Sequence, residues 1–187
     1  MDVVFVTSNA HKAREAQLIL GAAVKVVNAE LDEIQSLDVE EIARKKVIQA
    51  YYSVGKPVFV EDTGLYINGL DGFPGPLVKW MAKGLGYEGM CRAVDICDDR
   101  SAYAMTCIAM YNGKALNSFI GRIDGRIAQH PVGKGKFGWD PIFIPRGQDK
   151  TFAQMPVAKK NGISMRSIAM KKLGLFLLAK NKGNTYI

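Results

Sequence analysis

The amino-acid sequence predicts an α/β domain built on a mixed β-sheet. Near its start, a short β-branched run at residues 3–6 reads as a buried strand, and residues 10–20 have helical character. Later, two longer runs at 102–111 and 114–127 read as paired strands around Asn112-Gly113, a dipeptide typical of β-hairpins. One chain that contains both patterns favours a mixed sheet with helices packed against it.

The turn chemistry between these segments supports the prediction. Thr7-Ser8-Asn9 is a cluster of helix-capping residues directly after the first strand, and Gly21 ends the helix that follows. The remaining elements are a strand at 24–27, an acidic loop at 30–35, an amphipathic helix at 40–52, a buried strand at 58–60 that ends at Glu61-Asp62, a Gly/Pro-rich turn region at 69–75, helical segments at 77–83 and 89–96, and a last helix at 164–180.

Composition indicates a globular protein. The chain has 187 residues, of which 48% are hydrophobic and 23% are charged. No apolar run approaches the about 20 residues that span a bilayer, so we expect no membrane association and a cytoplasmic location. The 3 cysteines form no CxxC pair, which favours reduced thiols over disulfides or a zinc site.

The net charge of +7 fits nucleic acid, an anionic small substrate or simply a basic surface. Lysine and arginine are spread along the whole chain rather than gathered in one arm or block. We therefore expect no nucleic acid as the partner, and a phosphate-bearing small molecule is compatible with the same charge.

The first group of candidate site residues lies between the first strand and the first helix, at Thr7, Ser8, Asn9, Ala10, His11 and Lys12. A helix N-terminus carries unpaired N–H groups and about half a positive charge, so it attracts phosphate. The alternative is an ordinary N-cap followed by a solvated lysine. No GxxxxGK[ST] motif occurs, which argues against a P-loop enzyme.

The second group is Glu61-Asp62-Thr63-Gly64, at the predicted end of a buried strand. Ligands of α/β proteins gather at the carboxyl ends of strands, and carboxylates are oxygen ligands suited to Mg²⁺. Glu33, in the acidic loop, is a further candidate carboxylate. The alternatives are a polar turn that closes the strand and a solvated acid in the loop.

Two further groups lie in the last third of the chain. Phe137 and Trp139 flank Gly138 and precede Asp140, an arrangement that can hold a planar base, although core packing is the alternative. The second of these groups lies at residues 160–166 and contains a predicted helix cap, Ser164. Its two cations, Lys160 and Arg166, can face anions or a carbonyl. The alternative is a capped helix with surface cations.

The order and spacing of six blocks resemble the inosine triphosphate pyrophosphatase family. These blocks are TSNAHK at 7–12, VEDTGL at 60–65, GFPGP at 72–76, FGWDPIF at 137–143, TFAQM at 151–155 and KNGISMR at 160–166. The resemblance implies hydrolysis of ITP, dITP and XTP to the monophosphate and pyrophosphate. It also implies one domain over residues 1–187, with a two-lobed fold, a long curved mixed sheet and a cleft between the lobes, and it implies a homodimer.

The resemblance also implies roles for individual residues. Residues 7–12 would form the triphosphate loop, and Lys46 would be a second phosphate lysine, with its neighbour Lys45 as the alternative. Asp62 would be a metal ligand or the general base, beside Thr63, and Glu33 would complete a site for Mg²⁺ or Mn²⁺. Phe137 and Trp139 would be the pair that stacks on the base. The full set of residues at the base and sugar would be Phe137, Gly138, Trp139, Asp140, Lys160, Met165 and Arg166. Lys79 matches a further family contact.

Three positions depart from the family pattern. Met165 stands where a histidine is usual, Gln154 where a glutamate is usual and Leu77 where a tyrosine is common. Arg166 can donate to the C6 carbonyl of hypoxanthine or xanthine, whereas adenine offers no acceptor there. With Met165 unable to donate, we expect weaker selectivity against GTP or ATP. A pyrophosphatase for modified pyrimidines, a nucleic-acid-binding module and an inactive homologue are the rival interpretations.

Overall fold

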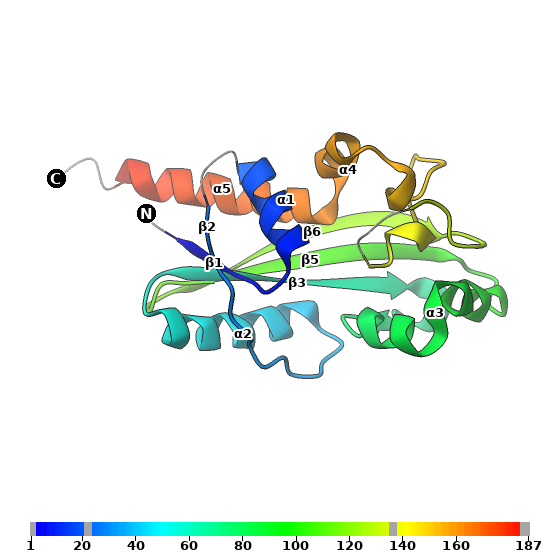
Figure 1. The fold of residues 1–187 in the computed structure, drawn as a ribbon, viewed down its shortest axis with the longest axis horizontal. Coiled ribbons are helices and arrows are strands. Elements are labelled where there is room, and N and C mark those ends of the chain that lie inside the picture. Colours follow the sequence, from blue (N-terminus) through cyan, green and yellow to red (C-terminus); the bar gives the residue numbers. More distant parts are fainter. Residues whose placement is uncertain (1–2, 21–23, 135–137, 184–187) are drawn as a thin grey trace.

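The computed structural model describes residues 3–20, 24–134 and 138–183 (Figure 1). Within these ranges, the strands of the sheet are β1 (Val4–Val6), β2 (Lys25–Val27), β3 (Val58–Ile67), β4 (Pro74–Gly75), β5 (Ser101–Tyr111), β6 (Leu116–Ile127) and β7 (Phe143–Pro145). They form one sheet in the order β2-β1-β3-β5-β6-β7, and β4 pairs with β3 outside this path. β1 is parallel to β2 and to β3, whereas the pairs from β3 to β7 are antiparallel, so the predicted mixed sheet is confirmed.

The helices cover both faces of this sheet (Figure 1). The helices are α1 (Ala10–Leu20), α2 (Val39–Val54), α3 (Val78–Asp95), α4 (Val157–Ile163) and α5 (Met165–Gly183), with 3₁₀ turns at Asn68–Leu70, Asp140–Ile142 and Phe152–Gln154. α1 and α5 lie on one face, and α2 and α3 lie on the other. Separate apolar clusters therefore pack between the sheet and α2 and between the sheet and the α1–α5 pair.

The hairpin and the Ser164 helix cap form as the sequence predicts, whereas the predicted end of the first helix at Gly21 lies outside the described residues. β5 and β6 pair from Ser101↔Arg126 to Tyr111↔Leu116, and the Asn112 side chain accepts hydrogen bonds from the next turn residues. Ser164 caps α5, because its hydroxyl accepts a hydrogen bond from the backbone N–H of Ser167 at 3.2 Å. α3 joins the two predicted helical segments across a kink at Gly86.

The predicted end of the strand at Glu61-Asp62 is wrong. β3 continues to Ile67, because β5 pairs with it over its whole length, from Val58↔Tyr111 to Ile67↔Ala102. The backbone of β5 supplies hydrogen-bond partners to the polar part of β3, so this part remains extended within the sheet. The acidic residues consequently lie in the middle of a long strand.

The other edge of β3 contains a gap. β1 pairs with β3 only as far as Phe59, and β4 pairs with it only from Leu65. Among the described residues, no strand covers the segment between these two positions on that side. Side chains from both faces of β3 can therefore reach the same opening.

Other expectations concern the cysteines, membranes and domain extent. Cys91, Cys97 and Cys107 are free, as predicted. No helix in the described ranges is long and apolar enough to cross a membrane. The extent of the domain, residues 1–187, stays a prediction.

Candidate active site

A cavity of about 860 Å³ opens at the gap in the edge of β3. Most of the predicted site residues line it: Thr7, Ser8, Asn9, Lys12, Glu33, Lys46, Asp62, Thr63, Lys79, Gly138 and Trp139. Others lie outside its lining: Ala10, His11, Asp140, Lys160, Met165 and Arg166. Phe137 falls outside the described residues. The gap in the sheet thus brings together the loop at 7–12, the carboxylates Glu33 and Asp62, and the Gly138-Trp139 segment, which are far apart in sequence.

The loop between β1 and α1 is an N-cap that faces the cavity. The Asn9 side chain accepts hydrogen bonds from the backbone N–H groups of His11 at 3.0 Å and Lys12 at 3.2 Å, and Thr7 accepts one from Asn9. The Lys12 ammonium donates to the Glu61 carbonyl at 3.2 Å, at the unpaired edge of β3. The loop therefore does form an ordinary N-cap, which was the alternative interpretation. Its lysine, however, is not simply solvated, because Lys12 contacts the wall of the cavity.

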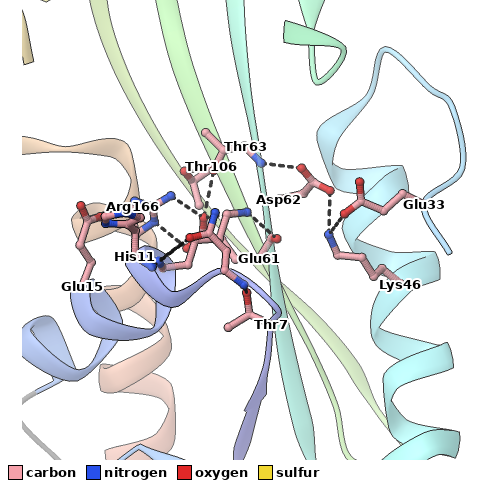
Figure 2. A network of polar contacts seen from close by, with 12 residues as sticks. Thr7, His11, Glu15, Glu33, Lys46, Glu61, Asp62, Thr63, Thr106 and Arg166 are labelled. Carbon is pink, nitrogen blue, oxygen red and sulfur yellow. Dashed lines mark hydrogen bonds and ion pairs between the residues drawn. The ribbon is translucent and has the colours of Figure 1, made fainter. Parts of the chain in front are cut away.

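On the α2 side of β3, one lysine bridges two carboxylates. The Lys46 ammonium donates to Glu33 at 2.7 Å and to Asp62 at 3.0 Å, and the second Asp62 oxygen accepts from the Thr63 backbone N–H (Figure 2). Burial lowers the pKa of Lys46, but the two carboxylates outweigh it and raise that pKa above its ordinary value. Lys46 is therefore a permanently charged member of this cluster at neutral pH.

Lys45 does not take part in this cluster. Its ammonium pairs with Glu41 at 3.0 Å, one turn earlier on α2, and its side chain is largely exposed. Since neighbouring helix positions point in different directions, only Lys46 of this pair lines the cavity. The geometry thus favours Lys46 as the phosphate lysine.

Glu33 and Asp62 are suited to hold a divalent cation. Both carboxylates approach a single point, which the Lys46 ammonium marks, and both line the open cavity. Mg²⁺ is usually held by one or two carboxylates together with water and substrate phosphate. No set of three or more acidic, histidine or cysteine side chains suited to a metal occurs in the described ranges, so water and substrate oxygens would complete the coordination of a cation held by this pair.

On the opposite face of β3, a chain of buried charges alternates in sign. Arg166 donates to both oxygens of Glu61, at 2.7 and 2.9 Å, and also contacts Glu15 (Figure 2). Lys160 pairs with Glu15 at 3.6 Å and with Asp140 at 2.6 Å. Burial would raise the pKa of Glu61, yet Arg166 and Lys12 bring it down to about 2.

Arg166 does not lie where the predicted contact with the base would place it. Its side chain is fully buried and its guanidinium is held by Glu61 and Glu15, behind the cavity wall. Two carboxylates in a low-dielectric interior attract the guanidinium more strongly than an open cavity does. Contact between Arg166 and a base therefore stays a prediction, and it requires movement of this side chain or of the wall.

Trp139 and its neighbours form the apolar end of the cavity. Trp139 is largely buried and packs edge-on against Phe143, with ring centroids 5.6 Å apart, although it still lines the cavity. Met165 is fully buried in the same apolar cluster. One Asp140 oxygen accepts from Lys160, the other has no partner among the described residues, and burial raises the pKa of Asp140.

Of the two other departures from the family pattern, Gln154 has a structural role and Leu77 lies directly before α3. The Gln154 side chain accepts a hydrogen bond from the Thr151 backbone N–H at 3.0 Å and completes a capping box. A glutamate could accept the same hydrogen bond, so the helix turn tolerates either residue. Leu77 lines a small side cavity next to Trp80.

The sequence predicts no role for Glu15 and Tyr87. It groups Glu61 with Asp62 as a candidate carboxylate, whereas Glu61 is buried and paired with Arg166. Glu61 is next to Asp62, and the period-two alternation of a strand would have placed it on the opposite face had the strand been extended. Glu15 lies one turn after Lys12 on α1, which was a usable signal. Tyr87 lines the cavity from α3 and had no signal in the sequence.

Several known proteins are similar to this chain in sequence and in fold. The Ham1 family profile matches residues 3–176. Inosine triphosphate pyrophosphatase 2 of Trypanosoma cruzi is 44% identical over 176 residues, which cover 91% of this chain and 89% of the relative. The dITP/XTP pyrophosphatase of Thermococcus kodakarensis is 39% identical over 180 residues, which cover 95% and 97%. A HAM1 protein from Coxiella burnetii has a similar structure, with a TM-score of 0.85, 28% identity and coverage of 96% and 100%. The chain belongs to the Ham1 family.

Proposed function

We propose that this protein hydrolyses purine nucleoside triphosphates with non-standard bases, such as ITP, dITP and XTP, to the monophosphate and pyrophosphate. The observation that carries the proposal is the Glu33–Lys46–Asp62 cluster, which faces the capped loop at 7–12 across one cavity. Lysines and a helix N-terminus favour a polyphosphate, whereas the carboxylates are useful there only if a cation accompanies it. Relatives named for these activities support the same conclusion.

In this proposal, the polyphosphate lies between the loop at 7–12 and α2. Lys12 and Lys46 offset its negative charge, while Thr7 and Asn9 orient it by hydrogen bonds. Asp62 accepts a proton from the water that attacks the α-phosphorus, or holds that water in line, and pyrophosphate leaves. Positioning and charge neutralisation supply most of the rate.

Mg²⁺, with Mn²⁺ as the alternative, is the proposed cofactor, held by Glu33 and Asp62. When bound, it supplies charge neutralisation at the phosphate oxygens and lowers the pKa of bound water. Lys46 occupies the point between these carboxylates in this structure, so its ammonium has to move from that point when a cation binds there, and its third N–H can then be donated to phosphate.

Trp139, Gly138 and Tyr87 mark the end of the cavity where the base would lie. The apolar environment suits a planar ring, and the phosphate groups would then extend toward Lys12. A homodimer is also proposed, on the basis of the family resemblance, and the expected cytoplasmic location stays a prediction.

Pyrophosphate release from ITP with Mg²⁺ tests the proposal. Asp62→Asn should lower kcat by about 10²- to 10⁴-fold, because it removes a proton acceptor or water ligand. Asp71→Asn is the matched control, since Asp71 is exposed, lies outside the cavity lining and has a left-handed backbone conformation that asparagine also tolerates.

A panel of substrates distinguishes this proposal from the rival interpretations, such as a pyrophosphatase for modified pyrimidines or an inactive homologue. XTP, GTP, ATP, dUTP and methylated UTP are compared with ITP on one preparation. A wild-type protein that releases no pyrophosphate from ITP, or a preference for the pyrimidines, would overturn the proposal.

A further inference from the structure

The wall of the cavity opposite the loop at 7–12 is formed by a broken helix. Within α3, Gly86 has φ 65° and ψ 171°, a conformation that is essentially restricted to glycine. The break separates residues 78–85 from 87–95. Ala82, Lys83, Gly86 and Tyr87 all line the cavity at this point. The kink therefore makes Tyr87 the first residue of a new helical segment at the cavity wall.

Tyr87 lies at the apolar end of the cavity. Its ring packs against the cluster that contains Trp139 and Met165, and both Tyr87 and Trp139 line the cavity. Partial burial, with an added contribution from the nearby Asp140 carboxylate, raises the pKa of Tyr87. The phenol is therefore protonated at neutral pH and can donate a hydrogen bond.

The Tyr87 hydroxyl has no hydrogen-bond partner among the described residues, and it is partly exposed to the cavity. Besides the indole N–H of Trp139 and the Lys83 ammonium, the other groups at this end offer few side-chain donors. The Met165 side chain carries no N–H or O–H, Arg166 is held by Glu61 and Glu15, and Asp140 only accepts in its ionised form. A base carbonyl that enters this end would meet the tyrosine hydroxyl as an available donor.

We propose that Tyr87 is a specificity-determining residue, which donates a hydrogen bond to the C6 carbonyl of a hypoxanthine or xanthine base held beside Trp139. The inference rests on the proposed function and deepens it. Tyr87 would take the donor role that Met165 cannot fill. Adenine has an amino group at C6, which can only donate, and a phenol is a stronger hydrogen-bond donor than acceptor, so the hydroxyl gains less from ATP than from ITP.

Tyr87→Phe tests this contact, because it removes only the hydroxyl. We expect kcat/KM for ITP and XTP to fall about tenfold, mainly through KM, and kcat/KM for ATP to change less than twofold. Binding of the product IMP, measured by calorimetry against AMP as the reference ligand, should weaken by a similar factor. Tyr52→Phe is the matched control, because Tyr52 is 77% exposed on α2, away from the cavity lining.

The outcomes separate the two proposals. A lower ITP-to-ATP ratio in Tyr87→Phe, with an unchanged melting temperature and unchanged Tyr52→Phe kinetics, supports the role of Tyr87. An unchanged ratio, or equal losses for ITP and ATP, overturns it while leaving the proposed function intact. If the wild-type protein does not hydrolyse ITP, the proposed function itself fails, and the preference of IMP over AMP in the binding assay still decides whether Tyr87 reads the base.

Discussion

The two faces of β3 carry clusters of similar chemistry in very different surroundings. On one face, Glu61 pairs with Arg166, and both side chains are 0% exposed. On the other face, the Asp62 and Lys46 side chains are 13% and 9% exposed, and their third partner, Glu33, is 58% exposed. Adjacent residues of one strand thus place one carboxylate in the interior and the next in an open cavity.

This difference in burial separates a fixed cluster from an exchangeable one. Removing charges from water costs several kcal/mol per ion in real proteins, so the interior pair persists only with complete hydrogen bonding. Glu61 meets this condition, because it accepts from Arg166 and from the Thr63 hydroxyl. The open cluster is partly solvated, so its members can exchange partners at lower cost. We infer that the buried face positions the strand while the open face binds ligands.

The largest effect is expected from breaking the buried pair. Arg166→Met should destabilise the protein by about 3–5 kcal/mol, because the buried Glu61 would lose both guanidinium hydrogen bonds and keep the more distant Lys12, at 3.4 Å, as a charged partner. Urea unfolding measures the change. The double variant Glu61→Leu/Arg166→Met should recover part of the loss, since it removes both charges. A cost below about 1 kcal/mol for Arg166→Met would show that the pair is not stabilising in the way that its burial implies.

The two faces of β3 also differ in how well the sequence predicts them. The local signals were sufficient for the Asn9 helix cap, the Asn112 hairpin and the amphipathic helix that carries Lys46, because each depends on neighbours a few residues away. The family resemblance placed Asp62 and Lys46 in one site, and the structure brings them within hydrogen-bond distance.

The buried network could not be predicted in the same way. Arg166 and Glu61 are separated by 105 positions, and their pairing depends on how α5 packs against the sheet. The end of β3 was mispredicted for a related reason, since the partner strand that extends it begins only at Ser101. Position along the chain also gave no sign that the Gly86 kink would bring Tyr87 to the cavity.

A smaller effect is expected from acid. The pKa of Glu61 falls from its ordinary value of 4.5 to about 2 in the folded protein, through its ion pairs. A carboxyl with a depressed folded-state pKa contributes stability that is fully present above the unfolded pKa and is lost as the pH falls through the folded pKa. This contribution, about 3 kcal/mol, should therefore disappear between about pH 4.5 and pH 2.

Unfolding free energies measured across this pH range, for the wild type and for Glu61→Gln, test the assignment. The variant should be less stable at neutral pH and should have a flatter profile below pH 4.5, because its amide does not titrate. Parallel profiles for the two proteins would mean that another carboxyl dominates the acid response.

The smallest change in stability is expected in the open cluster, where it should depend on the metal. Lys46→Met leaves Glu33 and Asp62 facing each other, which should cost about 1–2 kcal/mol without divalent ions, since partial exposure screens their repulsion. Mg²⁺ would replace the missing positive charge. Added Mg²⁺ should therefore raise the melting temperature of Lys46→Met more than that of the wild type, in which the lysine competes for the same carboxylates.

Thermal unfolding in EDTA and in Mg²⁺ measures this difference. Lys45→Met is the control, because Lys45 is exposed, lies outside the cavity lining and pairs with Glu41. Equal Mg²⁺ shifts in wild type and Lys46→Met would mean that the ion does not bind between Glu33 and Asp62. The expected inequality would show that the two faces of β3 differ in function because they differ in burial: a charge that water can reach is replaceable by a ligand, whereas its neighbour on the buried face is not.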